Sequence, residues 1–132
     1  MQRVFGRGAH ATAVAVGADT AYRIVRGDTL LGFALVRDVK GKDQPITFLV
    51  ATDPTDRLKD VDILVYREPY GGEVAYDAWR RQFRGKSADD PLQVGRDIRT
   101  ISGATISVNS VTLGVRRALS DLTAWHRSGA LE

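Results

Sequence analysis

A single stripe of apolar residues at helical spacing runs through the last quarter of the 132-residue chain. Its members recur three and four positions apart, and they are Val108, Val111, Val115, Ala118, Leu119, Leu122 and Trp125. Such a stripe predicts one long amphipathic helix, which needs an apolar surface of matching length to pack against. Ser107 or Thr105 is the expected N-cap, His126 and Arg127 suit the last turn, and Gly129 marks the end.

The surface for this helix is predicted to be a β-sheet. Strand patterns rich in β-branched and aromatic residues cover residues 22–25, 31–36, 46–52 and 61–66. Because the turns between them are short, the strands should form an antiparallel meander and not βαβ units. We expect an α+β fold, with an antiparallel meander packed against helices and a long C-terminal helix, as a single domain over residues 1–132.

Two shorter helices complete the expected fold. Asp77 is the expected cap of a short helix that runs through Arg84 and stops at Gly85. Near the start of the chain, Val4 and Phe5 favour a short N-terminal helix.

Composition removes several classes of function. The chain has no cysteine, which excludes iron–sulfur clusters, thiolate metal sites and covalent c-type haem. Its two histidines, His10 and His126, lie far apart in sequence and have no matching carboxylate cluster, so no metal site is expected. The net charge of +3 comes from scattered Lys and Arg, so we expect no nucleic-acid binding.

The densest cluster of small and hydroxyl residues lies directly before the predicted long helix, at residues 97–107. Ser102, Gly103, Ala104 and Thr105 predict a tight turn that leads into the helix N-terminus. Free backbone N–H groups and the helix dipole favour an anion there, above all a phosphate. A simple capped helix after a strand is the alternative interpretation. No Walker lysine is present, so a nucleotide triphosphate site is not expected.

The run Ser102-Gly103-Ala104-Thr105, followed by Ile106-Ser107, resembles the signature of the FMN-binding domain family. That family includes the flavinylated domains of the sodium-pumping NADH:quinone oxidoreductase C subunit and of the Rnf complex G subunit. The resemblance implies that Thr105 carries FMN through a phosphoester bond. It also implies a flavin transferase as maturation partner, which uses FAD as the donor of FMN. Magnesium is needed by the transferase only, and not by this chain.

A second motif resembles the same family and lies in the same order along the chain. It consists of Glu68-Pro69-Tyr70-Gly71-Gly72, then Trp79, then Gln82-Phe83-Arg84-Gly85-Lys86. The resemblance covers residues 46–119 and is closest to small stand-alone members. One position departs from the family pattern, because Arg99 stands where the transferase usually requires an acidic residue; the nearest aspartate is Asp97. The sequence therefore leaves covalent and non-covalent FMN as alternatives.

These motifs predict the parts of an FMN site. The turn supplies Ser102, Gly103, Ala104, Thr105 and Ser107 to the phosphate, with Arg99 as a further phosphate partner; Glu68, Pro69, Tyr70, Gly71 and Gly72 are expected at the ring. A two-glycine loop that merely leaves a strand is the alternative for the second segment.

We expect an electron-transfer flavoprotein more than an enzyme with its own substrate, and we assign no catalytic residue. A flavin-dependent reductase of a small molecule and a non-covalent FMN-binding module without redox duty are the alternatives. The resemblance implies membrane-bound or exported redox partners. It also implies a periplasmic or other extracytoplasmic location, with a leader or anchor that this sequence does not include.

Overall fold

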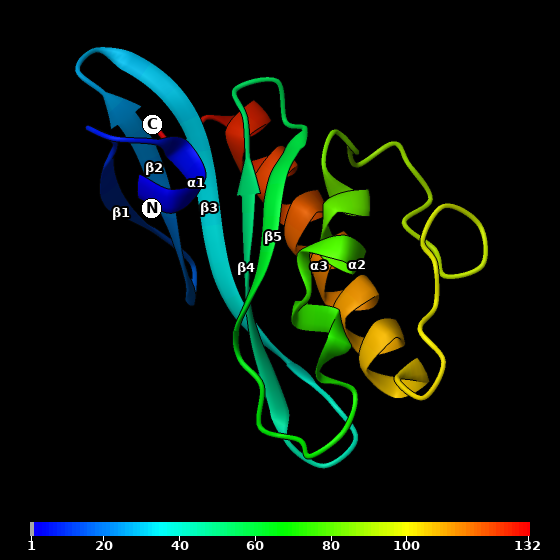
Figure 1. Ribbon diagram of the computed structural model, residues 1–132. Helices are drawn as coiled ribbons and strands as arrows, with labels where there is room; N and C mark the ends of the chain where they lie inside the picture. The colour runs from blue at the N-terminus through cyan, green and yellow to red at the C-terminus, as the bar shows by residue number, and fades with distance from the viewer. Residues whose placement is uncertain (1) are drawn as a thin grey trace.

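The computed structural model describes residues 2–132, and its centre is a five-stranded antiparallel sheet of order β1-β2-β3-β4-β5. Each strand pairs with the next strand in sequence, as Figure 1 shows. The strands are β1 (His10–Val16), β2 (Asp19–Arg26), β3 (Thr29–Lys40), β4 (Pro45–Thr52) and β5 (Leu58–Val65). The expected antiparallel meander and α+β class are confirmed.

Helices lie before and after the sheet in sequence. They are α1 (Gln2–Phe5), the 3-10 helix η1 (Gly72–Ala75), α2 (Asp77–Arg80), the 3-10 helix η2 (Arg81–Phe83) and α3 (Thr105–Ser128). The short helix predicted to run through Arg84 is therefore split into α2 and η2, and Arg84 is already extended. The prediction that Asp77 caps this helix was wrong, because Tyr76 is the N-cap and Asp77 is the first helical residue. The long C-terminal helix is confirmed as α3, which ends at Gly129 in the left-handed conformation, with φ of 82°.

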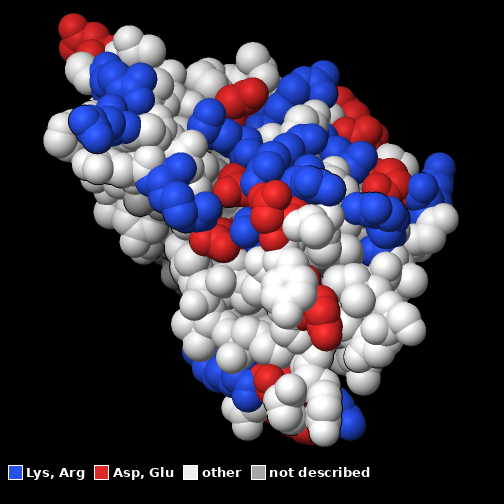
Figure 2. Space-filling model, viewed as in Figure 1, with Lys and Arg blue, Asp and Glu red and all other residues white. Residues whose placement is uncertain are grey.

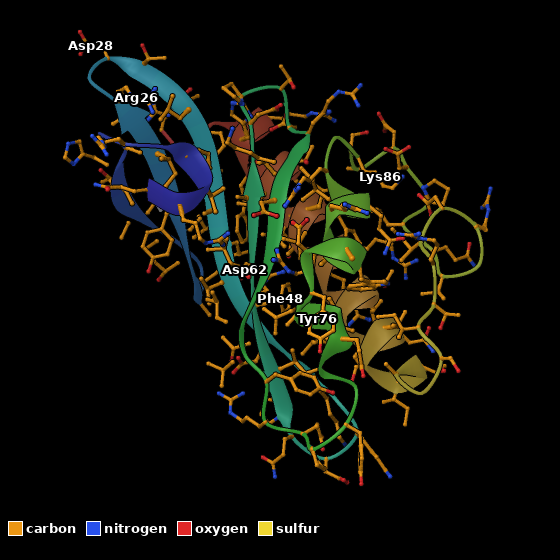
Figure 3. All side chains as sticks on the ribbon, in the orientation of Figure 1. Arg26, Asp28, Phe48, Asp62, Tyr76 and Lys86 are labelled. Atoms are coloured by element: carbon orange, nitrogen blue, oxygen red, sulfur yellow. The ribbon has the colours of Figure 1, made fainter. Side chains whose placement is uncertain are left out.

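The main core lies between α3 and one face of the sheet. Every member of the apolar stripe on α3 is buried except Trp125, which is partly buried. Phe48 of β4 points toward α3 (Figure 3), at the level of Gly114. An added Cβ at Gly114 would lie 2.8 Å from Phe48 Cζ, so this glycine lets the helix approach the sheet closely. Burial of this apolar surface is the main stabilising term of the fold.

A smaller apolar cluster covers part of the opposite face. Phe5 of α1 packs there with Ile24, Ala34 and Leu49, which confirms the expected N-terminal helix and its anchor. Arg3 forms an ion pair with Asp62 of β5. The short helix is thereby fixed by one buried ring and one surface ion pair.

The outer edge of β5 is covered by the segment that follows it. The backbone N–H of Leu58 donates to the carbonyl of Lys86, and Gly85 N–H donates back to Leu58, both at 2.7 Å. The buried guanidinium of Arg80 donates to the carbonyl of Val61 at 2.5 Å. These bonds satisfy backbone groups that an edge strand would otherwise leave unpaired.

Strand β1 is the element that the sequence did not predict. Its residues, from His10 to Val16, are mostly exposed, so no alternation of buried and exposed side chains marks it.

The last turn of α3 reaches the β4–β5 turn, where His126 Nδ1 lies 2.6 Å from Asp56 Oδ1. Among residues 2–132, no helix has the length and hydropathy needed to cross a membrane. The same residues contain no cluster of His, Asp and Glu suited to a metal ion.

Candidate functional site

A pocket of about 490 Å³ opens where three separate segments meet at one end of the sheet. Such a volume is typical of small-molecule sites, which run from roughly 300 to 1,000 Å³. The β3–β4 hairpin contributes Lys42 and Asp43, the chain after β5 contributes Tyr66 and Glu68 to Gly71, and the start of α3 contributes Gly103 to Ser107. The two motifs that the sequence singled out therefore line one pocket.

The N-terminus of α3 has unsatisfied backbone donors at this pocket. The N-cap is Ala104, with φ of −128°, and no side chain caps the helix. The first intrahelical bond runs from Val108 N–H to the Ala104 carbonyl, so the N–H groups of Thr105, Ile106 and Ser107 have no acceptor within the helix. No acidic residue lies in the first turn. The uncapped terminus therefore fits an anion.

The prediction that Ser107 or Thr105 is the N-cap was wrong. Thr105 is the first helical residue and Ser107 the third. The Thr105 side chain is exposed and lines the pocket, whereas Ser107 is buried and bonded to a tyrosine. Gly103, with φ of 82°, makes the turn that delivers the chain to the helix. The hydroxyl of Thr105 thus stands at the mouth of the uncapped terminus.

Tyr66 joins the two halves of the pocket. Its hydroxyl lies 2.7 Å from Ser107 Oγ and also donates to the carbonyl of Tyr70. One phenol therefore connects α3 to the loop that follows β5. No sequence pattern indicated this bond, because the partner serine lies 41 residues further along the chain.

Gly71 is required by both its backbone and its surroundings. Its φ is 86°, a conformation that residues with a Cβ rarely adopt. An added Cβ would lie 2.5 Å from Tyr66 Oη and 2.7 Å from Ser107 Oγ. The glycine therefore allows the loop to lie directly against the tyrosine and serine pair.

Glu68 holds the β3–β4 hairpin against the same loop. Its Oε1 accepts hydrogen bonds from the backbone N–H groups of Asp43 at 2.6 Å and of Gln44 at 2.7 Å. These two bonds, aided by the charge of Lys42, hold the pKa of Glu68 below its ordinary value. Glu68 is consequently an ionised clamp at neutral pH. A role as a general acid does not fit this environment.

Lys42 and Asp43 are pocket residues that no sequence motif indicated. Both are exposed in the hairpin loop, and they reach the pocket only because Glu68 holds that loop. No local pattern predicts such a contact between distant loops. Pro69 and Tyr70 also line the pocket and present flat side chains, and Tyr70 is 82% exposed. An aromatic ligand would find surface to stack on there.

The structure does not bring every predicted site residue into this pocket. Ser102 is exposed in the turn before the helix but does not line the pocket. Gly72 does not line it either, because it directly follows the last lining residue of its loop and starts η1. Arg99 lines a different hollow, beside α2, and its Nη2 donates to the Ala78 carbonyl at 3.3 Å.

Asp97 has a structural role away from the pocket. Its carboxylate accepts backbone hydrogen bonds from Leu92 at 3.0 Å and from Gln93 at 2.8 Å. Burial raises the pKa of Asp97, but these backbone donors outweigh burial and the net pKa is lowered. Asp97 therefore organises the loop that precedes the turn.

Comparison with known proteins identifies the class of ligand. A family described as FMN-binding domain matches residues 41–120, which contain both motifs and every residue of the pocket. The chain is 30% identical over 112 residues to the G subunit of the proton-translocating ferredoxin:NAD(+) oxidoreductase complex of Clostridium ljungdahlii. The match covers 79% of this chain and 60% of that relative, so the chain spans well under the full length of the relative. From the family match and the pocket that it encloses, we conclude that this chain belongs to the FMN-binding domain family.

Proposed function

We propose that this chain is an electron-transfer module whose FMN is joined to Thr105 through a phosphoester bond. FMN is the cofactor of the family, and the pocket fits it on independent grounds. The uncapped start of α3 suits the phosphate, and the volume of about 490 Å³ suits a small-molecule ligand. When bound, FMN supplies reversible electron chemistry.

The observation that carries the proposal is the position of Thr105. It is the first residue of α3, its side chain is exposed, and it lines the pocket beside three free N–H groups. A phosphate held by those groups would lie next to the Thr105 hydroxyl. The two other hydroxyl residues nearby are less suitable, because Ser102 lies outside the pocket and Ser107 is buried against Tyr66.

The attachment is a phosphoryl transfer from FAD, catalysed by a flavin transferase. The hydroxyl oxygen of Thr105 forms a bond to the phosphorus on the FMN side of FAD. The pyrophosphate P–O bond breaks, AMP leaves, and the hydroxyl proton passes to the transferase or to solvent. The N–H groups of Ile106 and Ser107 would stabilise the phosphate of the product.

The remaining pocket residues would hold and shape the ligand. Lys42 would add a positive charge to the pocket, and Gly71 would let its loop pack against Tyr66 and Ser107. Pro69 and Tyr70 would offer flat surface to the isoalloxazine ring.

Electron transfer is supported by the relative, whose name is that of an oxidoreductase complex subunit. We therefore propose redox partners that are bound to a membrane or exported, and an extracytoplasmic location for the module. The flavin transferase is its partner in maturation.

The test is coexpression with a flavin transferase, followed by denaturation in guanidinium and filtration. We expect flavin to remain with the chain, and the intact mass to rise by one FMN less water. Thr105→Ala should release all flavin. Thr12→Ala, which alters an exposed threonine of β1, is the matched control and should keep it.

Two results would overturn the assignment. Complete release of flavin from the native chain, despite an active transferase, would leave only non-covalent FMN. Retention of flavin in Thr105→Ala would move the bond to Ser102 or Ser107.

A further inference from the structure

A second hollow, of about 370 Å³, lies beside α2 and has no role in the FMN site described above. It is lined by Glu73, Tyr76, Ala78, Trp79, Arg99, Thr100 and Ile101. We propose that this hollow binds a small planar quinone with one negative charge, which is reduced to its hydroquinone by two electrons from the reduced module and two protons from solvent. The inference rests on the proposed electron-transfer function and names the partner class.

The hollow combines an aromatic surface with a fixed indole. Trp79 is only 5% exposed, and its Nε1–H donates to the Arg99 carbonyl at 2.7 Å. Tyr76, by contrast, is 65% exposed and projects outward from the segment between β5 and α3 (Figure 3). Aromatic side chains favour planar ligands, which stack against their faces or edges.

Arg99 supplies the charge selectivity. Its backbone is held on both sides, since its N–H donates to Gln82 Oε1 at 2.7 Å and its carbonyl accepts from Trp79. Its guanidinium forms no ion pair with a carboxylate of residues 2–132, and its Nη2 donates to the Ala78 carbonyl at 3.3 Å. An arginine with a fixed backbone and no acidic partner fits an anionic group on a ligand.

The surrounding surface makes this charge distinctive. On the face drawn in Figure 2, Lys and Arg side chains gather in a band across the upper half, and the area directly below that band is mostly uncharged. Arg99 is the one Lys or Arg among the described residues that line this mainly apolar hollow. Glu73, which also lines the hollow, would disfavour ligands that carry several negative charges.

The two hollows share a thin wall. The turn from Ile101 to Ala104 is closed by a hydrogen bond of 3.0 Å from Ala104 N–H to the Ile101 carbonyl. Ile101 lines the hollow, and Ala104 lines the FMN pocket. A turn of this kind keeps its first and last Cα atoms within about 7 Å. A ligand in the hollow would therefore lie close enough to the flavin site for direct electron exchange.

The experiment measures binding of naphthoquinone sulfonate to the flavin-free full chain by calorimetry, and then to the FMN-loaded chain. We expect one site in both forms. Arg99→Gln should weaken binding roughly tenfold, as loss of a charge-assisted hydrogen bond predicts. Arg96→Gln, which removes an exposed charge three residues away, is the control and should bind normally. The affinity for naphthoquinone without the sulfonate should change little, and by the same amount, in both variants.

Three outcomes would overturn the inference. They are absence of binding to the native chain, equal losses in Arg99→Gln and Arg96→Gln, and loss of the site when FMN is loaded. The last would make the hollow part of the flavin site. Binding to the flavin-free chain does not depend on redox activity or on Thr105. Failure here is therefore distinguishable from failure of the proposed function.

Discussion

Tyr66 and Ser107, which are 41 residues apart in sequence, meet through a hydrogen bond of 2.7 Å between Oη and Oγ. This contact joins the loop after β5 to the first turn of α3. Because the same phenol also donates to the Tyr70 carbonyl, the two walls of the FMN pocket are fixed relative to each other. The pocket is thus organised by its own side chains as well as by the sheet beneath it.

Removal of the Tyr66 hydroxyl should weaken FMN binding without unfolding the chain. One hydrogen bond contributes about 0.5–1.5 kcal/mol, so Tyr66→Phe should raise the Kd for FMN roughly two- to tenfold. Titration of the flavin-free protein measures this value. Ser107→Ala should have a similar effect, and the double variant should lose less than the sum of both. Tyr22→Phe, on the opposite face of the sheet, is the control and should bind FMN as the native chain does. Equal affinity for FMN in Tyr66→Phe and the native chain would contradict the prediction.

Gly71→Ala should reduce FMN binding, because the new methyl group would meet both Tyr66 and Ser107. Gly85→Ala is a closely matched control. Gly85 has φ of 84°, almost the same as Gly71, but an added Cβ would have no neighbour within 4 Å. Both variants should lose about 1–2 kcal/mol of stability from backbone strain. Only Gly71→Ala should lose FMN affinity, and equal affinities in the two variants would remove Gly71 from the site.

The Glu68 clamp predicts a pH dependence. A carboxylate whose folded pKa is lowered stabilises the folded state above its unfolded pKa of about 4.3, and this contribution is lost as pH falls through the lower folded pKa. Glu68→Gln should therefore be less stable than the native chain at neutral pH, and the difference should disappear in acid. Urea unfolding at a series of pH values measures it. Glu73→Gln, which alters an exposed carboxylate five residues away, is the control and should match the native chain in stability at neutral pH.

Gly114 provides a test of the helix–sheet contact. Gly→Ala in a helix normally stabilises by about 0.8–1.0 kcal/mol, whereas overpacking a core costs about 1–3 kcal/mol. Since the new Cβ would lie 2.8 Å from Phe48 Cζ, we expect Gly114→Ala to be net destabilised in thermal or urea unfolding. Combining it with Phe48→Leu should recover part of the loss. A stabilised Gly114→Ala would show that Phe48 moves aside at little cost.

Local patterns predicted most of the fold. The long apolar stripe identified α3, and alternating side chains identified the strands that have one buried face. Strand β1 was missed because its side chains are mostly exposed, so its pairing with β2 leaves no hydrophobic alternation. The N-cap was placed wrongly because a hydroxyl before an apolar run is an ordinary cap. In this chain, the Ser107 hydroxyl is bonded to Tyr66 and Thr105 lies inside the helix.

The site was less predictable where it depends on distant contacts. Both motifs were found from the sequence, and the pocket brings them together. Lys42 and Asp43 could not be assigned, because only the Glu68 clamp carries their loop to the pocket. Arg99 was expected at the phosphate, but hydrogen bonds to Trp79 and Gln82 hold its backbone beside α2.

The order of elements along the chain has a consequence for biosynthesis. All five strands precede residue 66, whereas the helix that covers their apolar face is completed only at Ser128. During synthesis the sheet therefore leaves the ribosome before its covering helix exists, and domains of this size generally fold as units. The anion-binding end of α3 acquires its opposite wall only when that helix docks. Occupancy of the pocket by cofactor is thus restricted to molecules in which α3 has already docked on the sheet.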